Sequence, residues 1–235
     1  MTDATKTTGR RTELHMARSM CWHCQSEVTG EYFCDHCVKL QPLSKELDYF
    51  TCLGLPRRLT IDPQDLETRF YRMSRSFHPD FYQNKSDTEQ TISLGNSALL
   101  NIAYRTLKDP ILRAEYLVHL EAGSAKDIRT SPPADLFEEI LSLQEDLEAF
   151  RALPPTGKEE ETARLRTKLA ADRDSLEARE GAMDRRLTEL FAAWDRTADT
   201  DAPEQKAAVL KDLRDLLSNR TYLRNIITDL VATTA

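Results

Sequence analysis

The segment PQDLETRFYRMSRSFHPD, residues 63–80, joins a clear helical pattern to an abrupt stop. Its large apolar residues recur at intervals of four and three, which places them on one face of a helix: Leu66, Phe70, Met73 and Phe77. Pro79 disfavours helical geometry at the residue before it and cannot continue the turn. The segment therefore predicts a helix over 63–77 that ends in a rigid corner, on which His78 and Asp80 are exposed.

Three arginines lie to one side of this apolar stripe, on a face that is free to meet water or a partner: Arg69, Arg72 and Arg75. A turn beside a solvated basic face accounts for these features, and the HPD tripeptide alone favours that interpretation. Two flanking segments add weight to a functional role, DYFTCLGL at residues 48–55 and NIAYRTLKDP at residues 101–110.

Composition narrows the possible classes of protein. The chain has 235 residues, of which 40% are hydrophobic and 30% charged, and it contains only 7 Gly. It lacks an apolar run of the roughly 20 residues that a membrane span needs, and it has few glycines for a phosphate-binding loop. The net charge of −7 argues against nonspecific binding to a nucleic acid. These properties predict a mostly helical protein with no membrane or nucleic-acid partner.

Two CxxC pairs, CWHC at residues 21–24 and CDHC at residues 34–37, indicate a metal site. Both thiolates of such a pair can point at one metal, and two pairs complete the tetrahedral four-sulfur site that structural zinc prefers. The predicted ligands of a structural Zn²⁺ are Cys21, Cys24, Cys34 and Cys37. Because four thiolates fill the coordination shell, the site has no open position for a substrate, and we expect no catalytic residue here.

Other interpretations of the cysteine and histidine residues carry less weight. A redox-active CxxC of the thioredoxin type belongs to a βαβ setting, which the sequence does not indicate. His23 and His36 are expected to be exposed or to lie behind the ligands, and Cys52 is expected to be a small core residue. Residues 1–20 show no secretory signal, so we expect the thiols to stay reduced.

Prolines and apolar periodicity divide the chain into five parts. We predict a disordered tail over 1–20, a cysteine module over 21–41, a helical domain over 46–122, a linker over 123–132 and a second helical domain over 133–235. The predicted helices cover residues 46–54, 63–77, 88–108, 110–121, 133–152, 158–198 and 203–232.

The helix predicted near 133–152 has a core stripe within about 40° of one direction: Leu136, Ile140, Leu143, Leu147 and Phe150. Phe137 and Leu141 project away from that stripe, and acids such as Glu145 and Glu148 lie on a neighbouring face. The two apolar side chains form either a binding patch or part of a larger core, and the residues alone leave both interpretations open.

The HPD tripeptide with its two flanking segments resembles a J-domain, a helical hairpin that stimulates ATP hydrolysis by a DnaK-type chaperone. The continuation LRAEYL at residues 112–117, followed by three more helices, is similar to the HscB (Jac) co-chaperones of iron–sulfur cluster assembly. The tetracysteine start resembles the zinc-bearing branch of that family. The resemblance implies an all-α fold, with a J-domain hairpin and a C-terminal three-helix bundle after a small zinc module.

The resemblance also implies a function without enzymatic activity. His78, Pro79 and Asp80, with Arg69, Arg72 and Arg75, would contact a DnaK/HscA-type chaperone, although Phe81 replaces the basic residue that many J-domains have there. Phe137, Leu141 and Glu145 would bind an IscU-type iron–sulfur scaffold, while Glu138 and Ser142 depart from the family pattern.

Two other functions stay open, a general J-protein that delivers unfolded clients and a CxxC thiol oxidoreductase. The acids Asp3 and Glu13 are unusual in a transit peptide, so we expect the cytoplasm of a bacterium rather than the mitochondrial matrix.

Overall fold

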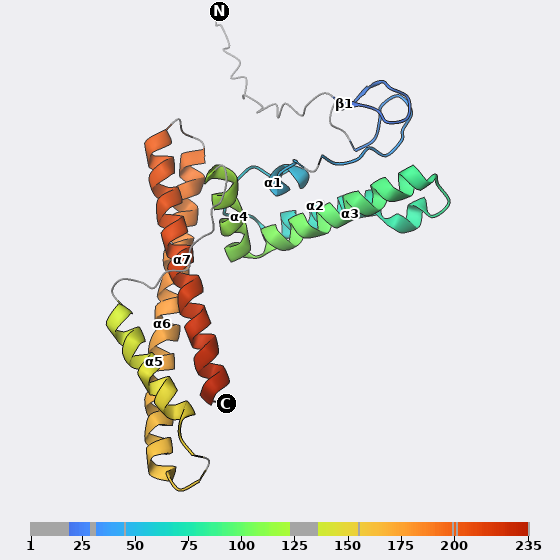
Figure 1. Cartoon of the computed structure of the whole chain (residues 1–235). Helices are drawn as coiled ribbons and strands as arrows, with labels where there is room; N and C mark the ends of the chain where they lie inside the picture. Colours follow the sequence, from blue (N-terminus) through green and yellow to red (C-terminus); the bar gives the residue numbers. More distant parts are fainter. Residues whose placement is uncertain are drawn as a thin grey trace, which may run out of the picture. The chain divides into compact units, whose positions relative to one another are not determined.

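The structure is a computed structural model that describes residues 19–28, 32–44, 46–122, 136–154, 156–198, 200 and 202–234. The chain forms two compact units, one from residues 1–47 and 71–101 and the other from residues 48–70 and 102–235. The helices shown in Figure 1 make up most of the second unit. Most of the predicted tail and the whole predicted linker, 123–132, lie outside the described residues.

The first unit begins with the cysteine module. Strand β1 (Ser19–Met20) pairs antiparallel with β2 (Glu27–Val28), so β1 covers the two residues that come just before the predicted module. An isolated bridge joins Phe33 to Leu40 in the second half of the module. Its own core is small and consists of Cys21, Val28 and Cys34. A module of this size depends on a metal or on neighbouring elements for stability.

The antiparallel hairpin that the resemblance implies is made by α2 (Pro63–Phe77) and α3 (Asp87–Lys108), joined through the 3₁₀ turn η1 (Pro79–Tyr82). The predicted limits of α2 are confirmed. Helix α3 starts one residue earlier than predicted, because Ser86 and Glu89 bond reciprocally as a capping box, with Ser86 Oγ 2.9 Å from Glu89 Oε2. The predicted apolar stripe of α2 is buried at Leu66, Met73 and Phe77 and half-buried at Phe70.

Helix α1 (Tyr49–Cys52) in the second unit is shorter than the predicted 46–54. Asp48 caps its N-terminus by accepting a hydrogen bond from the Thr51 N–H at 2.9 Å. Gly54, with φ of +64°, ends it in the left-handed region that favours glycine. Helix α4 (Pro110–Ala122) packs against α1 through the stacked rings of Tyr49 and Tyr116, whose centroids are 4.2 Å apart.

The predicted C-terminal three-helix bundle is confirmed. It consists of α5 (Phe137–Arg151), α6 (Glu159–Ala198) and α7 (Pro203–Thr234), with α6 and α7 side by side and α5 beside α6. Its core contains apolar residues from all three helices: Leu136, Ile140, Leu143, Leu147, Leu169, Leu176, Leu223, Ile227 and Leu230. Helix α4 also packs against α7, so the bundle and the base of the hairpin belong to one compact unit. Among the described helices, none combines the length and apolarity that crossing a membrane requires.

Candidate functional site

The HPD corner lies where the sequence predicts it, directly after the last turn of α2. His78 leaves helical geometry with φ of −58° and ψ of 125°, and Pro79 opens the 3₁₀ turn η1. The His78 and Asp80 side chains are 50% and 69% exposed. His78 Nδ1 lies 3.3 Å from the Asp80 backbone nitrogen and 3.4 Å from Asp80 Oδ2. The corner therefore presents an imidazole and a carboxylate, side by side, to solvent.

Side-chain hydroxyls hold the end of α2 behind this corner. The Phe77 carbonyl accepts hydrogen bonds from Ser93 Oγ at 2.6 Å and Ser97 Oγ at 3.0 Å, both from α3. The Ser76 carbonyl accepts one from the Tyr82 hydroxyl at 2.9 Å. These carbonyls belong to the last turn of α2. No further helical turn follows whose backbone N–H groups could donate to them. The sequence analysis did not single out Ser93 and Ser97, although their spacing of four residues places both on one face of a helix.

The three predicted arginines divide into two kinds. Arg72 and Arg75 are exposed. Arg69 is half-buried, where its Nε donates to Asp65 at 2.8 Å and its Nη1 donates to the Gly54 carbonyl at 2.7 Å. Arg69 therefore links α2 to the end of α1, whereas Arg72 and Arg75 are available to a partner.

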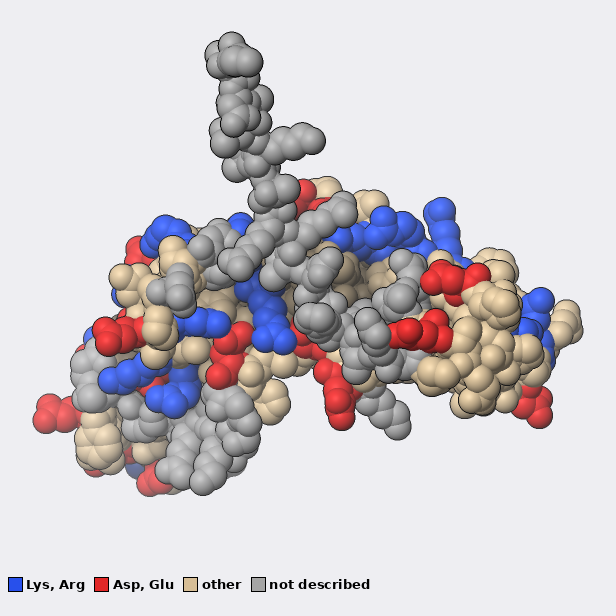
Figure 2. Space-filling model, turned by 90° about the horizontal axis from the view of Figure 1, so that it is seen from above, with Lys and Arg blue, Asp and Glu red and all other residues tan. Residues whose placement is uncertain are grey.

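Acidic and basic side chains are interspersed with uncharged ones on the face of the molecule shown in Figure 2. Nucleic-acid-binding proteins typically show a continuous basic stripe instead. The absence of a nucleic-acid partner stays a prediction.

The four predicted metal ligands come together. Their sulfur atoms lie within 4.8 Å of one another, and Cys21–Cys37 and Cys24–Cys34 are each 3.6 Å apart. A tetrahedral ion with metal–sulfur bonds of about 2.3 Å requires sulfur atoms about 3.8 Å apart, whereas a disulfide requires about 2 Å. The donor set therefore fits a four-coordinate metal.

Hydrogen bonds favour the thiolate form of Cys21 and Cys34, whereas burial raises the pKa of the Cys37 thiol to about 12. Ser26 Oγ lies 3.3 Å from Cys34 Sγ, and this hydrogen bond, with backbone N–H donors, lowers the pKa of the Cys34 thiol to about 6. The N–H groups of His23 and Cys24 point at Cys21 Sγ, and together they outweigh the burial that acts to raise its pKa. Donors of this kind stabilise sulfur ligands behind the metal.

The other candidate ligands are placed as predicted. His23 and His36 are exposed and do not join the cluster of sulfurs. Cys52 is fully buried in the second unit, and burial raises the pKa of its thiol to about 11. Cys52 is therefore a core residue.

Helix α5 presents the predicted apolar pair to solvent. Phe137 and Leu141 are 60% and 49% exposed, while the core stripe on the opposite side is buried except for Phe150, which is half-buried. Glu145 is also exposed. The pair is therefore not part of the core of its own unit.

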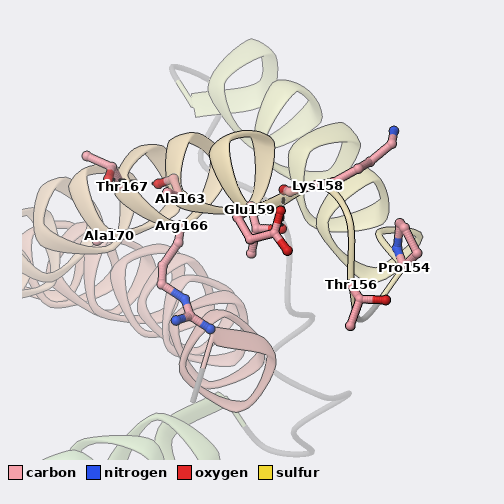
Figure 3. Close-up of a pocket in the computed structure, with 9 residues that line it drawn as sticks. Pro154, Thr156, Lys158, Glu159, Ala163, Arg166, Thr167 and Ala170 are labelled. Carbon is pink, nitrogen blue, oxygen red and sulfur yellow. Dashed lines mark hydrogen bonds between the residues drawn. The ribbon is translucent and has the colours of Figure 1, made fainter.

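A pocket of about 580 Å³ lies at the start of α6 (Figure 3). Its two cations already have partners, since Lys158 pairs with Glu161 at 3.0 Å and Arg166 lies over the Phe150 ring. It contains none of the predicted site residues.

A helical hairpin with an exposed His-Pro-Asp corner defines a J-domain co-chaperone. Over 158 residues the chain is 33% identical to the iron–sulfur cluster co-chaperone protein HscB of Mus musculus, and the match covers 65% of this chain and 67% of that protein. The chain belongs to the HscB family of co-chaperones.

Two further relatives agree with this assignment, and one solved structure shares the fold. The chain is 41% identical over 103 residues to the co-chaperone protein HscB of Proteus mirabilis, covering 43% of this chain and 60% of the relative. It is 34% identical over 125 residues to an HscB homolog of Arabidopsis thaliana, covering 53% of this chain and 49% of the relative. The crystal structure of human HscB shares the fold, with a TM-score of 0.61, 21% identity and coverage of 91% of this chain and 98% of that one. No protein-family model matches the chain.

Proposed function

We propose that this protein stimulates ATP hydrolysis by a DnaK/HscA-type chaperone through its HPD corner and delivers an IscU-type iron–sulfur scaffold through α5. The observation that carries the proposal is the exposure of His78 and Asp80 on a corner that the protein holds from behind. Nothing in this arrangement requires the protein to catalyse a reaction itself.

The chaperone contact would combine the corner with the exposed guanidinium groups of Arg72 and Arg75. Positive charge beside the corner would attract an acidic surface and orient it before contact. We leave Arg69 out of this contact, because its hydrogen bonds to Asp65 and Gly54 give it a role in the fold.

The scaffold contact would use Phe137 and Leu141 as its apolar centre and Glu145 at its edge. Interfaces of this kind gain most of their affinity from a few large apolar groups that become dry on binding. Glu138, which is exposed on the same helix, would lie at the polar rim.

Binding both partners at once would raise the concentration of the scaffold near the chaperone without any further contact between them.

We also propose that the tetracysteine metal is Zn²⁺ with a structural role, since a closed four-sulfur site leaves no position for a substrate. The cytoplasm of a bacterium is the compartment we propose, with the mitochondrial matrix as the alternative.

Single-turnover ATP hydrolysis by a DnaK/HscA-type chaperone tests the proposal. We expect this protein to accelerate hydrolysis, and an IscU-type scaffold to increase that effect further. An equal increase with any denatured protein would favour a general J-protein instead. Failure to stimulate hydrolysis would overturn the proposal, and insulin reduction by the metal-free protein would favour a thiol oxidoreductase.

A further inference from the structure

The cysteine module packs against the end of α2, one residue before the HPD corner. The rings of Tyr32 and Phe77 meet edge to face, with centroids 5.1 Å apart. The Tyr32 hydroxyl lies 3.7 Å from Met73 Sδ, towards which it donates. Phe77 is fully buried, so the module covers the side chain that immediately precedes His78.

The module is also bonded to the first half of α3. Lys39 Nζ lies 3.0 Å from Glu89 Oε2, and the Glu89 side chain is only 7% exposed. Glu89 belongs to the capping box that starts α3. A carboxylate in such a buried position is stable as an ion only with a partner, and Lys39 of the module supplies it.

Asn96 of α3 connects the module to the hairpin most directly. Asn96 is 2% exposed, and both polar atoms of its side-chain amide form hydrogen bonds. Nδ2 donates to the Gln41 carbonyl and Oδ1 accepts from the Leu43 N–H, each at 2.9 Å. The side chain of Gln41 in turn donates from Nε2 to Cys21 Sγ at 3.4 Å. A continuous set of hydrogen bonds therefore runs from a metal ligand to α3.

Helix α3 transmits this restraint to the corner. Ser93 and Ser97 flank Asn96 in the sequence and hold the Phe77 carbonyl. The metal ligand, the module, α3 and the last residue of α2 are thus joined by bonds that all lie within the first compact unit.

We infer that the metal-loaded cysteine module is a positioning element for the HPD corner, and that Asn96 is the residue through which it acts. Without a metal, a module of this size has too little core to stay folded. Its loss would uncover Phe77 and leave the buried ends of Asn96 without protein partners, so the last turn of α2 and η1 would open more often.

Amide hydrogen exchange of the full chain tests this inference. The protein is compared with Zn²⁺ bound and after removal of the metal by a chelator under reducing conditions. We expect exchange over residues 76–82 to become about tenfold faster without the metal, while residues 160–175 of α6 keep their rate. Equal rates over residues 76–82 in the two states would overturn the inference.

A pair of asparagine variants isolates the role of Asn96. Asn96→Ala should retain one Zn²⁺ per chain and yet show faster exchange over residues 76–82. Asn101→Ala changes an exposed residue of the same helix and should leave that rate unchanged. Equal exchange rates over residues 76–82 in the two variants would show that the module does not act on the HPD corner through Asn96.

If Asn96→Ala does not fold, Lys39→Met tests the other bond between the module and α3, the ion pair of Lys39 with Glu89. It should also speed exchange over residues 76–82, and an unchanged rate would count against the inference. The consequence for ATP hydrolysis rests on the proposed function, but exchange is measured on this protein alone. The inference can therefore fail while the proposed function holds, and the reverse.

Discussion

The carboxylate of Asp195 in α6 accepts a hydrogen bond at 2.7 Å from the backbone N–H of Leu59, which is 136 positions away in the sequence. Its second oxygen accepts from the Thr60 N–H at 2.8 Å. The neighbouring Trp194 donates from its indole nitrogen to the Arg57 carbonyl at 3.1 Å. Helix α6 therefore fixes the segment that leads into α2, and this joins the base of the hairpin to the C-terminal bundle.

Removal of this carboxylate is expected to destabilise the second unit. Asp195→Ala leaves two backbone N–H groups without their charged acceptor, at a cost of about 2–3 kcal/mol. Denaturant unfolding, followed by far-UV circular dichroism, measures the loss. Asp215→Ala is the matched control, because Asp215 is exposed and pairs with its sequence neighbour Arg214; we expect a change within about 0.5 kcal/mol. Equal unfolding midpoints for the two variants would contradict the role of Asp195.

The HPD corner yields a prediction on activity. His78→Gln should reduce stimulation of the chaperone ATPase at least about tenfold, because the imidazole is part of the surface that we propose for the chaperone contact. The fold should stay intact, since the side chain is half exposed. Asn84→Ala, an exposed residue just beyond η1, should stimulate like the wild type. Stimulation by His78→Gln at the wild-type rate would contradict the coupling role.

The exposed pair on α5 should separate binding from stability. The double variant Phe137→Ala, Leu141→Ala should raise the Kd for an IscU-type scaffold about 30-fold or more, with little change in melting temperature. Ile140→Ala is expected to lower the melting temperature and to change the Kd little. Ile140 is a core residue, and its truncation costs about 2–5 kcal/mol of stability.

Calorimetric titration and thermal melts measure these two effects. Val231→Ala truncates an exposed apolar residue of α7 and serves as the surface control. A large drop in melting temperature for the double variant would show that the pair belongs to the core.

Local signals explain why the helices could be predicted so closely. A proline at the first turn fixes the start of α2 and of α4, and Pro79 fixes the end of α2. The apolar stripes of α2 and α5 give the buried faces, since period alone determines which side chains share a face. The CxxC spacing likewise brings its sulfurs together without knowledge of the rest of the fold.

Contacts between distant segments could not be predicted in this way. The bonds of Asp195 to Leu59 and of Asn96 to Gln41 join residues that no periodic pattern links. Arg69 fits the predicted basic face by spacing, but its role depends on the Gly54 carbonyl from another segment. For the same reason the sequence could not decide whether Phe137 is exposed. The extent of the core depends on which other helices pack nearby.

Loss of the metal is expected to affect the first unit and to leave the second intact. Cys21→Ser removes one of four thiolates, so the protein should no longer retain one Zn²⁺ per chain after dialysis. Cys52→Ser is the matched control, because Cys52 is a buried cysteine outside the metal cluster; it should retain the metal although it perturbs the core. Elemental analysis measures the metal content. Stoichiometric zinc in Cys21→Ser would contradict the four-cysteine site.

The last prediction concerns pH and the cap of α1. Burial acts to raise the pKa of Asp48, but the Thr51 N–H and the Arg57 guanidinium, 2.8 Å away, outweigh it and hold that pKa below its usual range. Because the folded-state pKa is lowered, the carboxylate stabilises the second unit fully above the unfolded-state pKa of about 3.9. That contribution is lost as the pH falls through the folded-state pKa.

Asp48→Asn keeps an oxygen for the cap but loses the charge that faces Arg57. At pH 7 it should lower the free energy of unfolding by about 1.5–3 kcal/mol, as expected for a hydrogen bond to a charged group. As the pH falls below the unfolded-state pKa of about 3.9 and through the lowered folded-state pKa, Asp48 loses its charge, so the difference between the two proteins should shrink. Denaturant unfolding at pH 7, 5, 3 and 2 gives the comparison, with the exposed Asp212→Asn as the control. A constant difference at all four values would show that Asp48 acts through packing rather than through its charge.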